Sequence, residues 1–137
     1  MFEIINFKKF SDGRGDLIPI ELGSNFFYSQ IPFDVKRIYY ISSPSNEDNA
    51  VRGKHAHYNL EQVIICANGS LTIDLEDLKG EKKSLVLKEN NEGIYIKKGL
   101  VWRELKNFSN NCVVIVLASE HYDSKDYIDN YEKFKNL

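Results

Sequence analysis

Short segments in which apolar and polar residues alternate dominate this chain and predict β-strands. Residues 37–42 are aromatic and β-branched, and residues 62–67 form a continuous apolar run, which is typical of a strand covered on both faces. Asn68 and Gly69, which follow this run, are a strong hairpin signal, and residues 71–75 then alternate strictly. Further strands are expected at residues 84–87, 93–97 and 112–118. Many short strands separated by turns predict an all-β sandwich or barrel.

One helix is predicted, near the C-terminal end of the chain. Asp123 can cap its first turn, because a short acidic side chain accepts hydrogen bonds from free backbone N–H groups. After it, apolar residues recur at spacings of three and four, at Tyr127, Ile128, Tyr131 and Phe134. We expect this apolar stripe to pack the helix against the outside of the barrel.

Composition and charge favour a single domain over residues 1–137. Of the 137 residues, 42% are hydrophobic and 28% are charged, and the formal net charge is -2. This balance argues against a nucleic-acid partner, and the longest apolar runs fall far short of the ~20 residues that cross a bilayer. Residues 1–10 lack the basic-then-apolar pattern of a signal peptide, so we expect a cytoplasmic protein with no membrane partner.

Several residues whose side chains could act in catalysis or binding lie in the stretch RGKHAHYNLE, residues 52–61. His55 and His57 lie two positions apart, so on a strand both side chains point to the same face. Glu61 follows four residues after His57, directly before the apolar run and its turn. This is the spacing of the first motif of the cupin barrels, in which two histidines and a glutamate point into the barrel.

Three interpretations of the histidine pair are open. A metal site is one, since imidazoles suit first-row transition metals. Against it, the position at which a second cupin motif would supply another histidine holds Trp102, followed by Arg103, and an indole cannot coordinate a metal. A structural pair hydrogen-bonded within the barrel is the second interpretation. The third, which we favour, is acid–base catalysis, because a histidine with its ordinary pKa of ~6.5 both accepts and delivers protons near neutral pH.

Nearly the whole chain resembles one enzyme family. RGKHAHYNLEQVIICANGS, and the segment from GIYIKKGLVWRE to DYIDNYEKF, resemble the dTDP-4-keto-6-deoxyglucose 3,4-ketoisomerases, cupins that precede aminotransferases in the synthesis of 3-amino-sugars for surface polysaccharides. The resemblance includes INFKKFSDGRGDLIPIE and KRIYYIS near the N-terminus. The RGxHAH element and the LASxxYDxxDYI segment are typical of that family rather than of cupins at large.

The resemblance implies an all-β, jelly-roll cupin barrel with a short C-terminal α-helix. It also implies a homodimer, often with exchanged N-terminal strands, and a dTDP-linked 4-keto-6-deoxyhexose as substrate, with no metal or organic cofactor. The family's catalytic pair matches His55 and His57, and its pyrophosphate-binding arginine matches Arg52. Arg37 and Tyr39 are expected to line the site.

In the expected mechanism, His55 takes the proton from C3 of the sugar, and His57 shuttles a proton between the two oxygens or acts as the acid. Tyr39 donates a hydrogen bond to the developing oxyanion. Glu61 either orients a histidine or forms a salt bridge with an arginine, and Trp102 either stacks on thymine or fills the barrel. Two alternatives to this activity are a nucleotide-sugar epimerase and a sugar-binding cupin without catalysis.

Two arginines bear on the stereochemistry of the product. Arg103 follows the tryptophan at a position that is histidine or arginine in the family, and Arg14 lies in the SDGRGD loop at residues 11–16. We expect Arg103, Tyr39, Glu61 and Trp102 to converge on the barrel mouth, with Arg14 nearby. Arg103 favours the gluco epimer at C4.

Overall fold

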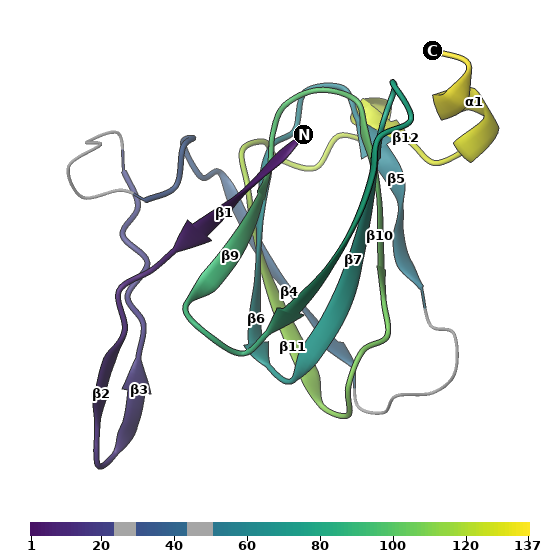
Figure 1. Cartoon of the computed structure of the whole chain (residues 1–137). Helices are drawn as coiled ribbons and strands as arrows, with labels where there is room; N and C mark the ends of the chain where they lie inside the picture. Colours follow the sequence, from purple (N-terminus) through teal and green to yellow (C-terminus); the bar gives the residue numbers. More distant parts are fainter. Residues whose placement is uncertain (24–29, 44–50) are drawn as a thin grey trace.

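In the part of the chain that the structure describes, residues 1–23, 30–43 and 51–137, two five-stranded antiparallel sheets face each other and form a barrel (Figure 1). The structure is a computed structural model. The first sheet has the strand order β1 (Phe2–Asn6), β9 (Glu92–Ile96), β6 (Gln62–Asn68), β11 (Cys112–Ala118) and β4 (Arg37–Ser43). The second has the order β12 (Tyr127–Ile128), β5 (Arg52–His57), β10 (Val101–Lys106), β7 (Ser70–Asp77) and β8 (Lys82–Lys88).

The main hydrophobic core lies between the two sheets, where alternate residues of each strand meet. On β7, the predicted apolar face formed by Leu71, Ile73 and Leu75 is buried, and it belongs to one cluster with Ile64 and Val114 of the facing sheet. Such burial of alternating apolar residues is the main free-energy gain of a two-layer β fold. The predicted all-β barrel is confirmed.

Strand β6 is covered on both faces, as its continuous apolar run predicts. Ile64 and Cys66 join the core between the sheets, whereas Val63 and Ile65 belong to a second cluster on the outer face. That second cluster includes residues from the N-terminal segment: Phe7, Ile18, Ile20, Ile31 and Phe33. Because side chains alternate along a strand, Gln62 points into the barrel on the same side as Ile64.

The C-terminal segment contains the predicted helix, but the helix is shorter than its apolar stripe indicates. Tyr127 and Ile128 form β12, which pairs with β5, and helix α1 covers only Tyr131–Lys135. Asp123 caps a single 3-10 turn, η1 (Ser124–Asp126), instead of the helix. Tyr127 lies in a strand and not in the helix because the edge of β5 has unpaired backbone N–H and C=O groups with which this segment pairs.

Helix α1 packs on the outside of the second sheet, as predicted. Phe134 is fully buried in a cluster with Ala56, Trp102 and Ile128. Helices in the described residues are at most two turns long, and none could cross a membrane.

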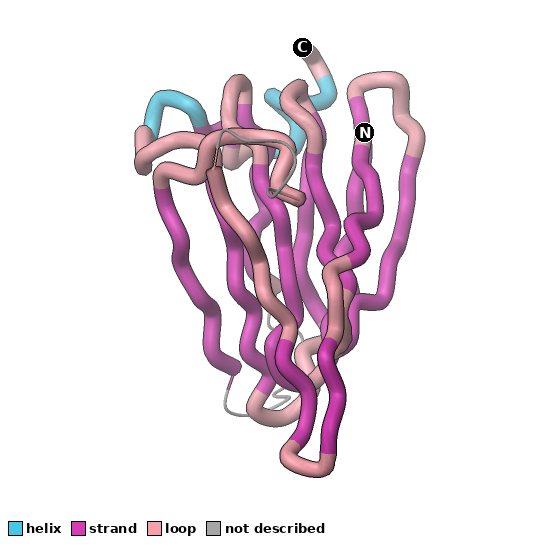
Figure 2. The backbone as a smooth tube through the Cα atoms, turned by 90° about the vertical axis from the view of Figure 1, so that its left-hand side faces the viewer, coloured by secondary structure: helices cyan, strands magenta, loops and turns pink. Residues whose placement is uncertain are grey.

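Residues 11–16, expected as a loop, form most of a β-hairpin. Strands β2 (Phe10–Asp12) and β3 (Gly15–Leu17) pair with each other, and the Ser11 hydroxyl donates to the Asp16 carboxylate at 2.6 Å. Gly15 has a φ of 121°, a conformation that glycine adopts without strain. Figures 1 and 2 show that the hairpin projects beyond the end of the barrel instead of covering it.

Candidate active site

Strand β5 positions the two histidines at the inner face of the barrel. The rings of His55 and His57 lie 4.6 Å apart, nearly perpendicular to each other, and His57 has no exposed surface. Gly53 precedes them with a φ of 77°, next to an irregularity in the pairing of β5 with β10. A side chain at this glycine would meet the Leu105 side chain at 3.2 Å and disturb the strand that carries both imidazoles.

Tyr127 forms the third ring of this cluster. Its centroid lies 4.9 Å from that of His55 and 4.3 Å from that of His57, because β12 places it directly opposite His57. The sequence analysis did not assign Tyr127 to the site, because it placed this residue on a helical apolar stripe that would face the outer surface of the sheet.

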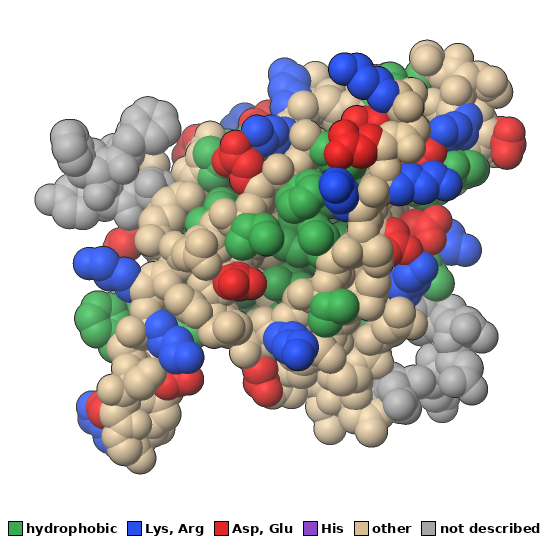
Figure 3. Space-filling model, in the orientation of Figure 1, with side chains coloured by type: hydrophobic (Ala, Val, Ile, Leu, Met, Phe, Trp, Pro, Cys, Tyr) green, Lys and Arg blue, Asp and Glu red, His purple; other side chains and the backbone are tan. Residues whose placement is uncertain are grey.

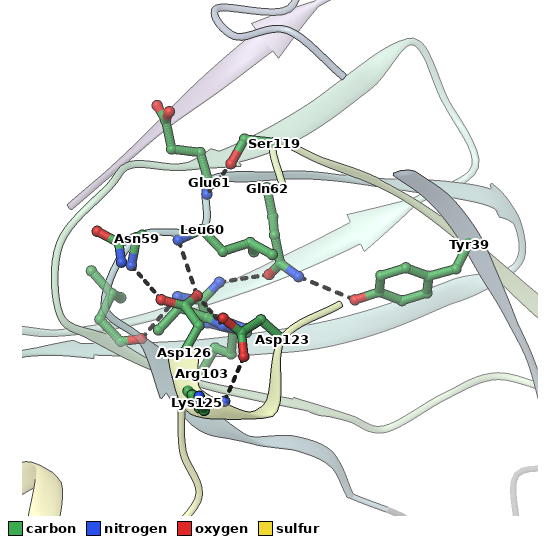
Figure 4. Close-up of polar contacts among 12 residues, drawn as sticks. Tyr39, Asn59, Leu60, Glu61, Gln62, Arg103, Ser119, Asp123, Lys125 and Asp126 are labelled. Carbon is green, nitrogen blue, oxygen red and sulfur yellow. Dashed lines mark hydrogen bonds and ion pairs between the residues drawn. The ribbon is translucent and has the colours of Figure 1, made fainter. Parts of the chain in front are cut away.

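Asp126 holds His57 in one orientation. His57 Nδ1 lies 3.1 Å from Asp126 Oδ2, and the same carboxylate accepts from the backbone N–H groups of Asn59 at 2.8 Å and Leu60 at 3.2 Å (Figure 4). An ionised carboxylate only accepts hydrogen bonds, so Nδ1 of His57 must carry the proton. Nε2 of His57 then presents a lone pair, and it is buried with no hydrogen-bond partner among the described residues.

A second polar chain runs from Arg103 through Gln62 to Tyr39 (Figure 4). Arg103 is 1% exposed; its Nη1 donates to Gln62 Oε1 at 2.6 Å and its Nη2 to the Val101 carbonyl at 3.0 Å. Gln62 Nε2 donates to the Tyr39 hydroxyl at 3.1 Å. Arg103 lies opposite His55 in the pairing of β10 with β5. The hydrogen-bond network of Arg103, Gln62 and Tyr39 therefore lies next to the histidine pair.

Burial and the neighbouring positive charge keep both imidazoles neutral. Burial, together with the charge of Arg103, lowers the pKa of His55 and of His57 to about 3. Burial also lowers the pKa of Arg103, to about 10, so the guanidinium remains charged at neutral pH. Burial is the main cause that raises the pKa of Tyr39 above its ordinary value, so its hydroxyl stays protonated. At pH 7 the site therefore holds two proton acceptors, a cation and a phenol donor.

Arg37 borders the same region from β4. Its guanidinium carbon lies 5.3 Å from the ring centroid of Tyr39 and 5.8 Å from that of Tyr122, within the range of cation–π contacts. Its Nε and Nη2 are buried and have no hydrogen-bond partner in the described part of the chain. Buried donors without partners are rare in folded proteins and suit an anionic or polar ligand.

A cavity of about 310 Å³ opens beside His55. It brings together four residues that the sequence analysis assigned to the site: Tyr39, Arg52, His55 and Arg103. Gln62 also lines it, and the sequence analysis missed this residue because it treated residues 62–67 as one apolar run. Figure 3 shows charged side chains around an apolar area on one face of the molecule.

Among the described residues, the Glu61 side chain contacts neither a histidine nor an arginine, which corrects both expectations for it. Its carboxylate accepts a hydrogen bond from the Tyr95 hydroxyl and points away from the polar cluster (Figure 4). Asp126, from the C-terminal segment, contacts His57 instead. The glutamate of the motif lies just before the start of β6, and it is the next residue, Gln62, that enters the barrel.

Trp102 lies on the opposite face of its sheet from the histidines. It is 5% exposed, its ring lies 5.3 Å from Tyr131 and 5.6 Å from Phe134, and it belongs to the cluster under α1. Trp102 therefore neither fills the barrel nor borders the cavity. Side-chain alternation on β10 sends Arg103 inward and its neighbour outward.

Arg14 does not line the cavity. It occupies the tip of the projecting hairpin, where its side chain is 91% exposed and pairs with Asp12 at 2.6 Å (Figure 2). Among the described residues, no group of three or more histidine, cysteine, aspartate or glutamate side chains is placed to hold a metal ion.

Comparisons with known proteins match nearly the whole chain. The family model described as FdtA, WxcM-like, C-terminal matches residues 1–137. The chain is 44% identical over 133 residues to TDP-4-oxo-6-deoxy-alpha-D-glucose-3,4-oxoisomerase of Aneurinibacillus thermoaerophilus, covering 97% of this chain and 89% of that protein.

Two solved structures are similar over nearly the full chain. A mutant 3,4-ketoisomerase from Thermoanaerobacterium thermosaccharolyticum in complex with TDP-4-keto-6-deoxyglucose has a TM-score of 0.86 and 42% identity, covering 98% of this chain and 91% of that one. The TDP-quinovose 3,4-ketoisomerase from Campylobacter jejuni has a TM-score of 0.85 and 41% identity, covering 99% of this chain and 98% of that one.

Proposed function

This chain belongs to the FdtA family, WxcM-like, C-terminal, and from that premise we propose that it is a nucleotide-sugar 3,4-ketoisomerase. It converts dTDP-4-keto-6-deoxyglucose into a dTDP-3-keto-6-deoxyhexose, a product suited to amination at C3. The observation that carries the proposal is the neutral pair His55 and His57, side by side at the inner face of the barrel with His55 lining an open cavity.

The reaction moves two protons and no other group. The ketone at C4 acidifies the hydrogen on C3, and a base removes it to give an enediolate shared by C3 and C4. Delivery of a proton to C4, with transfer of the hydroxyl proton between the two oxygens, leaves the ketone at C3. Adjacent imidazoles suit this sequence because one accepts a proton while the other delivers one.

The contact with Asp126 leads us to exchange the roles first expected for the two histidines. Asp126 fixes the tautomer of His57 so that Nε2 carries a free lone pair, and its carboxylate stabilises the imidazolium that forms when a proton arrives. We therefore assign His57 as the base at C3 and His55 as the group that returns a proton to C4. His55 takes up that proton from solvent through the cavity after the negative charge of the enediolate has formed beside it, and His57 releases the proton it accepted to solvent before the next turnover. Because the two rings are in contact, a small shift of the sugar serves both steps.

Three further side chains complete the proposal. Tyr39, protonated and lining the cavity, donates to the oxygen that becomes negatively charged. Arg52 at the cavity rim and Arg37 with its unpartnered donors bind the diphosphate through charge-assisted hydrogen bonds. Arg103, beside His55, favours the gluco epimer.

We include in the proposal a homodimer with exchanged N-terminal segments, with residues 1–137 as one domain of a cytoplasmic enzyme. Large apolar side chains that are exposed in the single chain support this dimer. Phe10 and Leu17 on the hairpin are 58% and 62% exposed, and Ile38 and Tyr40 on the outer face of β4 are 57% and 74% exposed. Such an exchange would carry Arg14 toward a second barrel. Light scattering of the protein in solution tests it, and a monomeric mass would contradict it.

Incubation with dTDP-4-keto-6-deoxyglucose and proton NMR of the product tests the activity. The proposal predicts a ketone at C3, and activity that persists after dialysis against a chelator. A product that keeps its ketone at C4 with inverted neighbouring carbons would identify an epimerase. Saturable binding without any product would identify a sugar-binding protein.

A further inference from the structure

Gln62 occupies a position that gives it control over Tyr39. It is the first residue of β6, it is 2% exposed, and it lies between a phenol on β4 and a guanidinium on β10 (Figure 4). Its amide makes two hydrogen bonds, one within its own sheet to Tyr39 at 3.1 Å and one to Arg103 of the facing sheet at 2.6 Å. A buried amide with partners on both ends has a fixed direction, and that direction has a chemical consequence.

Arg103 sets the direction of the Gln62 amide. A guanidinium has only donors, so the end of the amide that faces Arg103 must be the oxygen. The amide nitrogen then faces Tyr39, and because an NH2 group is only a donor, the Tyr39 hydroxyl must be the acceptor of this bond. The reverse orientation of Gln62 would set two donors against each other at Arg103.

Accepting from Gln62 leaves the Tyr39 hydroxyl with its own proton available. Within the described residues, this hydroxyl has no second hydrogen-bond partner, and the tyrosine lines the cavity next to His55. Burial keeps the phenol protonated by raising its pKa. The remaining direction for its O–H is toward a ligand.

We propose that Gln62 is a positioning residue, which aims the Tyr39 proton at the sugar oxygen that becomes negatively charged, while Arg103 locks the direction of the Gln62 amide. This inference rests on the proposed ketoisomerase function, because an enediolate supplies the oxyanion that needs a donor. It assigns to Gln62 no contact with the sugar itself.

Gln62→Glu separates this role from simple packing. The substitution keeps size and shape and strengthens the contact with Arg103, but it presents a carboxylate oxygen to Tyr39 in place of a donor. The Tyr39 proton is then donated to Glu at position 62 and is lost to the substrate. Since removal of one oxyanion donor costs on the order of 10²-fold in rate, we expect kcat to fall by about that factor while KM changes little.

A double-mutant cycle with Tyr39→Phe provides the decisive comparison of turnover. If Gln62 acts through the Tyr39 hydroxyl, Gln62→Glu lowers kcat in the wild-type background and causes no further loss in the Tyr39→Phe background. Asn107→Asp is the matched control, because it makes the same amide-to-carboxylate change at an exposed site after β10, and we expect unchanged kcat. Losses that multiply in the double variant would overturn the inference.

A readout without turnover keeps this inference distinct from the proposed function. NMR of protein labelled with ¹³C at the tyrosine ζ carbon follows the titration of Tyr39 directly, with Tyr39→Phe identifying its signal. We expect Gln62→Glu to raise the pKa of Tyr39, because a carboxylate replaces the donor that faces the phenol. An unchanged Tyr39 titration overturns the role of Gln62 even in an active enzyme, whereas a wild-type protein without ketone transfer refutes the proposed function alone.

Discussion

The two faces of the sheet that contains β5, β10 and β7 differ in how the buried polar groups beside them are paired. On the outer face, beside a groove of about 480 Å³, the buried carboxylate of Glu76 accepts from Lys135 at 2.6 Å and from Tyr131 at 2.8 Å. On the inner side, between this sheet and β4 of the facing sheet, five buried nitrogens have no partner among the described residues: Arg37 Nε and Nη2, His55 Nε2, His57 Nε2 and Arg103 Nε. Buried groups that are paired stabilise a fold, whereas unpaired ones carry a cost that a ligand removes. The inner face is therefore the reactive one.

The largest effect expected on the inner face is the loss of the histidines. Asn substitution of a general acid–base group lowers turnover by ~10²–10⁴-fold. We expect His57→Asn to abolish both ketone transfer and exchange of the C3 hydrogen with solvent. His55→Asn should abolish ketone transfer but retain exchange at C3. Calorimetric titration with TDP checks that both variants still bind the nucleotide, and equal exchange in the two variants would contradict the assigned roles.

Asp126→Asn tests the group behind His57. We expect kcat to fall on the order of 10²-fold, less than for removal of the histidine, because the imidazole remains but loses its fixed tautomer and the negative charge that stabilises its protonated form. The pH dependence of kcat should change as well. An unchanged kcat and pH profile would reduce Asp126 to a structural role in the turn at Asn59 and Leu60.

The pH dependence of stability should also come from the inner face. Both histidines have a folded-state pKa of about 3 against an ordinary value of 6.5, so the unfolded chain binds more protons in this window. The free energy of unfolding should fall as the pH drops from 6.5 toward 3. Urea denaturation at pH 7 and pH 5 measures this, and the variant with both histidines replaced by Asn should show a smaller difference. An equal difference in that variant would contradict the neutral pair.

The smallest effect is expected on the outer face. Glu76→Gln removes a charged partner of Lys135, so the free energy of unfolding should fall by about 1 kcal/mol. Turnover should be unchanged, because the groove on that side is separated from the cavity by the sheet. If kcat falls by more than the loss of folded protein accounts for, the two faces are coupled.

The sequence predicted the barrel and the inward histidine pair because both depend on local periodicity. A residue spacing of two fixes a shared face of a strand whatever the rest of the chain does. Arg52 and Tyr39 were predicted from the resemblance to the ketoisomerase family and not from periodicity. These residues border the cavity in the structure.

The wrong predictions concern two kinds of feature. One is which of two neighbouring side chains on a strand points into the barrel, and the other is a contact between segments far apart in the sequence. Glu61 and Gln62, like Trp102 and Arg103, are neighbours that point to opposite sides, and a motif spacing does not fix which of the two enters the barrel. Tyr127 fits a helical stripe equally well, and only the free edge of β5, 70 residues earlier in the chain, makes it a strand residue. Pairing between distant strands has no signal in a single sequence.

Solvent isotope labelling tests the central claim of proton transfer between two imidazoles most directly. The enzyme would act on dTDP-4-keto-6-deoxyglucose in deuterated water, and NMR would locate the ketone and the deuterium in the product. We predict a ketone at C3 and one deuterium at C4, because the proton delivered to C4 comes from a group that exchanges with solvent. A ketone that stays at C4, or a product without deuterium at C4, would contradict the account.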